Sequence, residues 1–400
     1  MAFPLNITLP APLRASPGLL LLCLGMLILP VSNAIGQVPL YLASLHWVWH
    51  FCRRPTRLPR GDVLFLLIFA LLIASGLLFG VRPGNTLSKL NRLLLFPLVF
   101  AVPEALRRSR EPAEGLKCFF LAYLAGMVVH FLFDAVRIPL EMRQGTAFVD
   151  TGNMTSPQLY MVALFLLLGL RAEWHSPRRI WRFALLCALA VGGMLLHNKR
   201  GVWLAAAVVV PVWTLRTRQW RTLAGLLLVG VLAFSLPTVR SRLLELREVV
   251  QPTHGGRMVL WREVAPRILP EHPWGMGYSA TEYTDFREIL PRNIHLEPGL
   301  KHLHSNFLQL RLELGWHGLI FWLIWMGTVL WQGFRRPPAT LRLARFAVAC
   351  CILALLVNGI VEYNFGNSEV FMTFLTLFGL LAGLHEPNAI WKPHEAAPAP

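Results

Sequence analysis

Charged residues are scarce in this sequence. Asp, Glu, Lys and Arg make up 15% of its 400 residues, against about 25% in an ordinary globular protein. Acids are the scarcer sign, with 21 Asp and Glu beside 38 Lys and Arg, while hydrophobic residues reach 55%. This composition excludes a typical soluble protein and predicts an all-α polytopic membrane protein with one helical domain.

The sequence also lacks the usual patterns of disulfide-stabilised and metal-binding proteins. Its six cysteines lie in or beside apolar runs, where small buried side chains are the ordinary interpretation. His302 and His304 form a His-x-His pair, but a metal site usually needs more ligands at defined spacing. The polar loops contain neither Asp-x-Asp nor His-Glu-x-x-His. We therefore expect no metal and no cofactor.

The excess of basic residues, a formal charge of +17, could indicate a nucleic-acid partner. These residues come in short clusters between apolar runs, which is how orientation signals and lipid-headgroup contacts are distributed. The pattern predicts contact with membrane lipids and no nucleic acid.

Apolar runs predict about twelve membrane spans, some of them short enough to require tilting or burial inside a bundle. Arg14 before a run of leucines resembles a signal peptide, but no convincing cleavage site follows, so we expect a retained first span. No internal repeat or βαβ pattern is present. The expected spans are 17–34, 36–51, 61–80, 93–106, 116–136, 157–172, 181–197, 202–215, 223–237, 316–334, 346–363 and 370–385.

Five basic loops fall on one side of this arrangement, which the positive-inside rule makes cytoplasmic together with both termini. The long polar segment before the third-last span then lies outside and should form a small helical cap. The expected organisation is spans one to nine in 1–237, the outer loop or cap in 238–305, spans ten to twelve in 306–385, and a cytoplasmic tail in 386–400.

Cations in outer loops need an explanation, because the orientation rule disfavours them there. Lys199 and Arg200 lie in a tight outer turn, either as an interfacial snorkelling pair or with Arg200 facing the bundle to hold a phosphate. Arg257 follows two glycines in the long loop and is either a solvated arginine or a second anion-binding residue.

His304 is the candidate base, since histidine titrates near neutral pH. If residues 304–314 are helical, His304 and Arg311 share a face and could address one ligand; a wet face on an interfacial helix is the alternative. The candidate carboxylates that could assist it are Asp150, Glu263 and Glu282.

Together these segments resemble the O-antigen ligase and polymerase superfamily. His304-Ser305, nine residues, and then Gly-Trp-His-Gly at 315–318 are similar to its histidine signature. The Arg-Gly-Val-Trp-Leu segment at 200–204 is similar to its Arg-Gly-x-Trp-Leu motif. Gly-Arg-x-x-x-Trp at 256–261, followed by Pro-Trp-Gly-Met-Gly at 273–277, is similar to a third motif, and all three occur in the family's order.

The resemblance implies a metal-independent, inverting glycosyltransferase of the bacterial inner membrane, with its active site in the periplasm. The donor would be a glycan linked to undecaprenyl diphosphate, and in the ligase branch the acceptor is a hydroxyl of the lipid A–core oligosaccharide. Arg200 and Arg257 would bind the diphosphate, with Lys199 and Arg311 as further binding residues, and His304 would activate or orient the acceptor.

Other functions remain open at this level. The polymerase branch, which joins lipid-linked repeat units, shares the histidine motif, whereas protein O-oligosaccharyltransferases are usually longer at the C-terminus. A transporter is a remote alternative from a different class. Carriers tend to have two similar halves and charges at the membrane midplane, and Asp134 is the main ionisable residue expected within a span.

Overall fold

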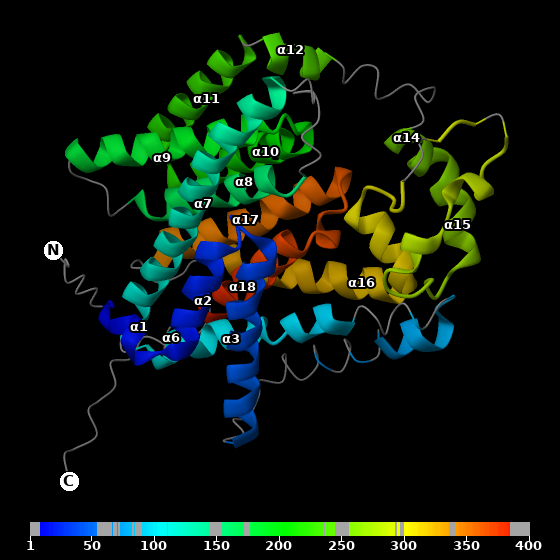
Figure 1. The fold of residues 1–400 in the computed structure, drawn as a ribbon, viewed down its shortest axis with the longest axis horizontal. Coiled ribbons are helices and arrows are strands. Elements are labelled where there is room, and N and C mark those ends of the chain that lie inside the picture. The colour runs from blue at the N-terminus through cyan, green and yellow to red at the C-terminus, as the bar shows by residue number, and fades with distance from the viewer. Residues whose placement is uncertain are drawn as a thin grey trace.

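The computed structural model describes residues 9–53, 66, 70, 73–81, 84, 90–109, 111–143, 154–171, 177–235, 237–244, 256–292, 294–296, 300–335 and 341–384. Every regular element within these residues is helical, as predicted (Figure 1). The α-helices are α1 (Ala11–Ala15), α2 (Pro17–Ile28), α3 (Asn33–Arg53), α6 (Leu98–Arg108), α7 (Pro112–Arg143), α8 (Ser156–Gly169), α9 (Pro177–Leu196), α10 (Arg200–Thr217), α11 (Trp220–Phe234), α12 (Pro237–Leu244), α14 (Arg257–Val259), α15 (Ala265–Glu271), α16 (Asn306–Phe334), α17 (Arg342–Val361) and α18 (Ser368–Gly383). Shorter turns are η1 (Leu90–Leu95), the π-helical turn η4 (Leu260–Val264), η5 (Ala280–Tyr283), η6 (Phe286–Ile289) and η8 (Asn364–Gly366).

Four described helices are long and apolar enough to cross a membrane: Pro112–Ile138, Arg179–Leu196, Asn306–Phe334 and Arg342–Val361. Four shorter apolar helices, α2, α8, α11 and α18, coincide with other predicted spans. The chain is thus a helical membrane protein. The count of twelve stays a prediction, and much of the expected span 61–80 lies outside the described residues.

Helices α8, α17 and α18 occupy the middle of the bundle (Figure 1). Every residue of α8 is buried, as expected of a helix that is apolar on all sides. It packs between α9 and α17, while α18 packs on α6 and α2 packs on α3 and α7. The central helices therefore have protein neighbours, and the exposed apolar side chains lie on the outer helices such as α3 and α11.

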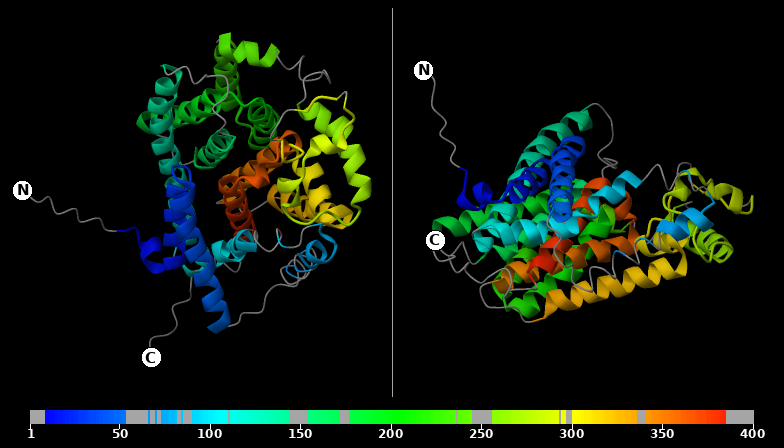
Figure 2. Two further views of the ribbon diagram at one scale, coloured as in Figure 1. Left: turned by 45° about the vertical axis from the view of Figure 1, so that its right-hand side comes forward. Right: turned by 90° about the horizontal axis from the view of Figure 1, so that it is seen from below.

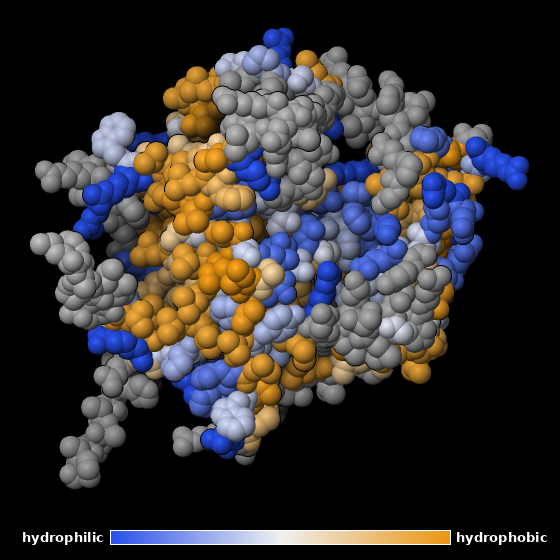
Figure 3. Space-filling view, in the orientation of Figure 1, coloured by the Kyte–Doolittle hydropathy of each residue, from blue (hydrophilic) through white to orange (hydrophobic). Residues whose placement is uncertain are grey.

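A second, smaller hydrophobic core lies in the segment between α14 and the first turns of α16. Its residues include Val259, Leu260, Phe286, Leu303 and Leu312, all at most 1% exposed. We call this part of the molecule, residues 256–305, the cap. It lies at one end of α16, and α1 lies at the opposite side of the molecule (Figures 1 and 2). In Figure 3, hydrophilic side chains gather between the bundle and the cap.

The cap is docked onto a break in α16. Gly315 has φ of 72°, outside the helical region, and this frees carbonyl groups that a continuous helix would use. The N–H groups of Met276 and Gly277 donate to the carbonyls of Leu312 and Glu313 over 2.8 and 3.0 Å. A side chain at Gly275, which has φ of +93°, would meet the backbone of Glu313. The glycines of the two motifs therefore serve one structural joint between cap and helix.

Candidate active site

The turn that carries Arg200 joins α9 to α10. Asn198 adopts a left-handed conformation with φ of 55°, which Asn tolerates better than most residues. Lys199 is the N-cap residue and Arg200 is the first residue of α10. The indole of Trp203 donates to the carbonyl of Met194 over 3.0 Å and so fastens the first turn of α10 to the last turn of α9.

Gly201 brings this turn against the end of α17. A methyl group at Gly201 would lie 2.9 Å from Nδ2 of Asn358 and 3.0 Å from Cγ2 of Val361, so a larger residue would push the helices apart. Glu362 directly follows Val361. Because residue 201 has no side chain, the start of α10 can lie close to Glu362, the residue that the other side chains of the site contact.

Glu362 is the C-cap residue of α17 and is only 7% exposed. Its Oε2 accepts a hydrogen bond from the guanidinium of Arg257 over 2.5 Å, and its Oε1 lies 3.1 Å from Nδ1 of His304. Burial opposes ionisation of this carboxyl, but the hydrogen bond from His304 and the charge of Arg257 outweigh burial and lower its pKa. Glu362 is therefore an anion at neutral pH that joins the two ends of the cap.

Glu362 was not among the residues predicted from the sequence. Of the three carboxylates that were predicted, Glu263 forms an ion pair with Arg267 and Glu282 accepts a hydrogen bond from Ser279. Asp150 lies outside the described residues. The available signal was an acidic residue at the outer end of an apolar run. Ionisable groups at such positions are costly and therefore often functional.

His304 precedes α16 in a left-handed conformation with φ of 47°. The backbone of the neighbouring residue Leu303 is held through both its N–H and its carbonyl group. Its N–H donates to Oε1 of Gln309 over 2.9 Å, and its carbonyl accepts from the indole of Trp261 over 2.8 Å. These bonds from α16 and η4 fix the backbone beside the imidazole, so His304 points at Glu362 instead of lying on the helix.

The contact with Glu362 also selects the tautomer of His304. A carboxylate accepts a hydrogen bond from a nitrogen that carries a proton. Nδ1 of the neutral ring is therefore the donor, and Nε2 is left as the basic nitrogen. The ring of His302 lies against this ring at a tilt of 53°, with centroids 4.1 Å apart. Burial, followed by the adjacent His304, lowers the pKa of His302 to about 4. His302 is consequently neutral at neutral pH and accepts a hydrogen bond from the backbone N–H of His304 over 3.3 Å.

Two asparagines connect the helix ends around this group. Asn306, the first residue of α16, donates to Oδ1 of Asn364 over 2.6 Å, and Asn364 donates to the carbonyl of Leu355 in α17 over 2.8 Å. Both asparagines are fully buried. The start of α16 and the end of α17, which carry His304 and Glu362, are therefore held together by hydrogen bonds.

Arg311 lies elsewhere. Helix α16 begins at Asn306, so the expected shared helical face of His304 and Arg311 does not exist. The guanidinium of Arg311 donates to the carbonyls of His272 and Leu269 over 2.8 and 3.0 Å and lies 4.6 Å from the ring of Trp316. It is 3% exposed. These contacts hold the cap to α16, and a phosphate would have to displace them.

A second polar cluster is buried within the bundle. Oδ2 of Asp134 lies 2.9 Å from Nε2 of His197 and 3.2 Å from Nε2 of His130, and it accepts from the hydroxyl of Tyr160 over 3.1 Å. Asp134 is 0% exposed. The cluster connects α7, α8 and the end of α9, just before the turn that carries Arg200.

Two groups of described residues could hold a metal ion by ligand type and proximity: His130, Asp134 and His197, and His302, His304 and Glu362. Two imidazoles and a carboxylate are ligands that zinc accepts. In the second group the charge of Glu362 is already balanced by Arg257 at 2.5 Å, so this arrangement is also complete as an Arg–Glu–His chain without an ion.

Part of the chain is similar to known proteins. Residues 185–323 match the family model described as O-antigen ligase, a range that includes Arg200, Arg257 and His304. A protein of Rickettsia felis is 25% identical over 299 residues, which cover 72% of each chain. A protein of Rickettsia conorii is 21% identical over 324 residues, covering 80% of this chain and 72% of the relative. For a protein of Rickettsia typhi the 26% identity extends over 145 residues, or 35% of each chain. All three carry names that provisionally describe a polysaccharide ligase.

Proposed function

We propose, from the match of residues 185–323 to the O-antigen ligase model, that this chain belongs to that family and transfers a glycan from undecaprenyl diphosphate to a hydroxyl of the lipid A–core oligosaccharide. The reaction takes place at the periplasmic face of the bacterial inner membrane, with both termini of the chain in the cytoplasm. The observation that carries the proposal is the chain of contacts from Arg257 through Glu362 to His304.

In this mechanism His304 is the general base. Nε2 takes the proton from the acceptor hydroxyl as the oxygen attacks the anomeric carbon of the donor sugar. Glu362 holds the ring through Nδ1 and stabilises the imidazolium that forms, as the carboxylate of a catalytic triad does. The sugar–phosphate bond breaks on the opposite side of the anomeric carbon, and the new glycosidic bond has inverted configuration.

Arg200 and Arg257 bind the diphosphate, and Lys199 adds positive charge to the same turn. One nitrogen of Arg257 contacts Glu362, but a guanidinium has five N–H donors, so the remaining ones are available to phosphate oxygens. Negative charge builds up on the diphosphate as it leaves, and fixed cations stabilise that charge without a metal. Arg311 has no part in this step because its donors hold the cap.

Reconstitution tests the proposed reaction. Purified protein in liposomes, lipid-linked glycan and lipid A–core should give a joined product that requires all three components. A product that forms without lipid A–core, in the form of longer lipid-linked glycans, would identify a polymerase instead. No product with either acceptor would contradict glycosyl transfer.

Donor affinity tests the roles of the arginines. Arg257→Ala and Arg200→Ala should each weaken the binding of undecaprenyl diphosphate by about 10- to 100-fold, the equivalent of one lost charge-assisted hydrogen bond of about 1.5–3 kcal/mol. Arg262→Ala is the matched control, because Arg262 is an exposed arginine on the adjacent η4 turn. Unchanged affinity in both variants would rule out the arginine clamp.

A further inference from the structure

A second cationic site lies far from His304, at the other ends of the same helices. Helix α10 starts at the Arg200 turn and runs for 18 residues, about 27 Å at 1.5 Å per residue. It ends beside the end of α16 and the start of α17, where a hollow of about 480 Å³ opens to the surface. The lining side chains include Arg216, Arg218, Arg335 and Arg342.

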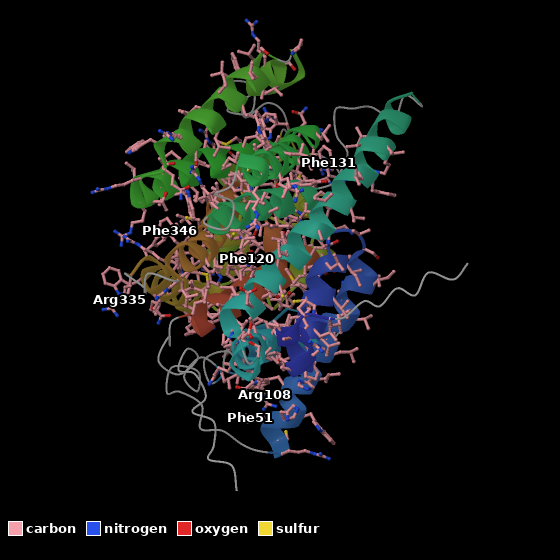
Figure 4. All side chains as sticks on the ribbon, turned by 90° about the vertical axis from the view of Figure 1, so that its left-hand side faces the viewer. Phe51, Arg108, Phe120, Phe131, Arg335 and Phe346 are labelled. Carbon is pink, nitrogen blue, oxygen red and sulfur yellow. The ribbon has the colours of Figure 1, made fainter. Side chains whose placement is uncertain are left out.

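The positions of these four arginines are set by the backbone. Arg218 is the C-cap residue of α10 with φ of 57°, and Arg216 donates to the carbonyl of Phe334 over 3.3 Å. Arg335 follows the last turn of α16 and lies 5.8 Å from the ring of Trp331. In Figure 4 Arg335 lies at the edge of the molecule, near Phe346. Three separate helix ends thus direct guanidinium groups to one hollow.

The charge of this hollow is not balanced within the described part of the chain. No acidic residue is among the described residues that line it, and none of the ion pairs found among the described residues includes one of the four arginines. Helix α17 begins at Arg342, so the partial positive charge of a helix N-terminus adds to that of the side chains. Four cations around one concavity favour an anion with several oxygen atoms, such as a phosphate group.

The remaining wall of the hollow is apolar. Leu343 and Phe346 of α17 line it together with Leu215 of α10, which is 66% exposed. Along the outer faces of α10 and α16 the exposed apolar side chains continue with Val208 and Trp331. A small hydrophilic anion would leave this surface uncovered, whereas a lipid would place its phosphate among the arginines and an acyl chain along Leu215.

We propose that this hollow, formed by α10, α16 and α17, is a binding site for the phosphate headgroup of an anionic glycerophospholipid. Basic pockets between membrane helices suit such headgroups, and each nearby cation adds to the attraction of an anionic lipid. The alternative is that these arginines only orient the chain in the membrane, which requires no pocket and no preference among bound lipids. The site is independent of the glycosyl transfer proposed above.

Native mass spectrometry of the full chain, released from vesicles of phosphatidylglycerol and phosphatidylcholine, tests this site. The wild type should retain phosphatidylglycerol in preference, and Arg218→Gln/Arg342→Gln should lower that retention at least about tenfold. The matched control is Arg14→Gln/Arg182→Gln, which removes two exposed arginines on α1 and α9 and should leave retention unchanged. If the double variant does not fold, Arg218→Gln alone provides the comparison.

Inorganic phosphate separates a lipid site from a simple anion site. Excess phosphate at millimolar concentration should not displace phosphatidylglycerol, because the acyl chain contributes to binding. Complete displacement would identify a pocket for free phosphate and overturn the lipid assignment. Equal retention of both lipids, or equal losses in the double variant and its control, would also overturn it.

Discussion

In the described part of the molecule, a carboxylate lies beside two histidines and an arginine twice, in two different surroundings. The buried cluster has Asp134 with His130 and His197, and Arg137 lies 3.9 Å from its carboxylate. The outer cluster has Glu362 with His302 and His304, and Arg257 lies 2.5 Å from its carboxylate. Residue type alone therefore cannot say which cluster performs chemistry.

What differs is the neighbourhood of the two carboxylates. Asp134 is 0% exposed and is bonded to side chains of α7, α8 and α9, so its partners are all structural elements of the bundle. Glu362 lies where the cap meets the bundle, while the arginine side chains of the two clusters are similarly exposed, 32% for Arg257 and 35% for Arg137. The first arrangement lies within the bundle and can stabilise the fold, whereas the second presents a cation and an imidazole at a junction between two parts of the molecule.

The largest expected effect is on the outer cluster. His304→Ala should lower the rate of glycan transfer by about 10²–10⁴-fold, because a positioned general base is lost. The midpoint of thermal unfolding should change little, since the backbone at 303 is held by Gln309 and Trp261. His295→Ala, at an exposed position of the cap, is the control. A normal transfer rate in the His304 variant would remove the residue from the mechanism.

A matched pair of amide substitutions separates the roles of the two clusters. Glu362→Gln should reduce the transfer rate by about 10- to 100-fold, since one charge-assisted hydrogen bond to the base is weakened. Asp134→Asn should instead reduce the free energy of unfolding by roughly 1–3 kcal/mol, because a buried donor is left without its acceptor. Transfer rate per folded molecule and thermal unfolding are measured for both variants.

Tyr160→Phe is the milder control for the buried cluster, because it removes one of the hydrogen bonds to Asp134 and keeps the ring. If Asp134→Asn abolished transfer while leaving unfolding unchanged, the buried cluster would be part of the catalytic machinery. The contrast drawn between the two regions would then be wrong.

Acid should weaken the outer cluster through His302. Its pKa is about 4 in the folded protein against 6.5 ordinarily, so the unfolded chain takes up this proton first as the pH falls. The contribution of neutral His302 to the free energy of unfolding is thus fully present above about pH 6.5. It declines toward pH 4, by no more than about 3 kcal/mol. Glu362, whose pKa is lowered, adds a further loss at more acidic pH.

Thermal unfolding between pH 7 and pH 4.5 measures this effect. His302→Gln should show a smaller decline than the wild type, whereas His295→Gln should follow the wild type. The described charged or titratable groups around His302 are His304, Glu362, Arg257 and Tyr363. A decline of equal size in all three proteins would assign the acid sensitivity to other groups.

The smallest expected effect is that of a chelator. Both clusters contain ligands that suit a metal, but in the outer cluster Arg257 already balances the carboxylate. Transfer should therefore continue in excess chelator. A loss of activity that zinc restores in the wild type, but not in His302→Gln, would place a metal in the outer cluster and replace the arginine-based mechanism.

Local patterns predicted much of this molecule. Long apolar runs require helices in a membrane, because backbone groups in lipid must be satisfied within the segment, and every regular element among the described residues is helical. Arg257 and His304 could be singled out because polar residues are conspicuous in such a background. The meeting of these residues at Glu362 was not predictable, because the sequence separations of 105 and 58 residues are bridged only when α17 packs beside the cap.

The motif glycines and Arg311 also show what the sequence alone does not predict, because their role in the structure differs from the one expected. Gly275, Gly277 and Arg311 lie among candidate functional residues, yet they form the joint that holds the cap to α16. A pattern indicates that a residue type is required but does not say whether a ligand or a neighbouring carbonyl requires it.

By itself, then, the sequence determined the helical membrane character of the chain and the set of polar residues available for chemistry, since both depend on local composition. Only the tertiary structure decided which of two similar clusters lies within the bundle and which lies at its junction with the cap. That distinction depends on how helices distant in sequence pack. Packing buries Asp134 among three helices and leaves Glu362 and its partners at the edge of the cap.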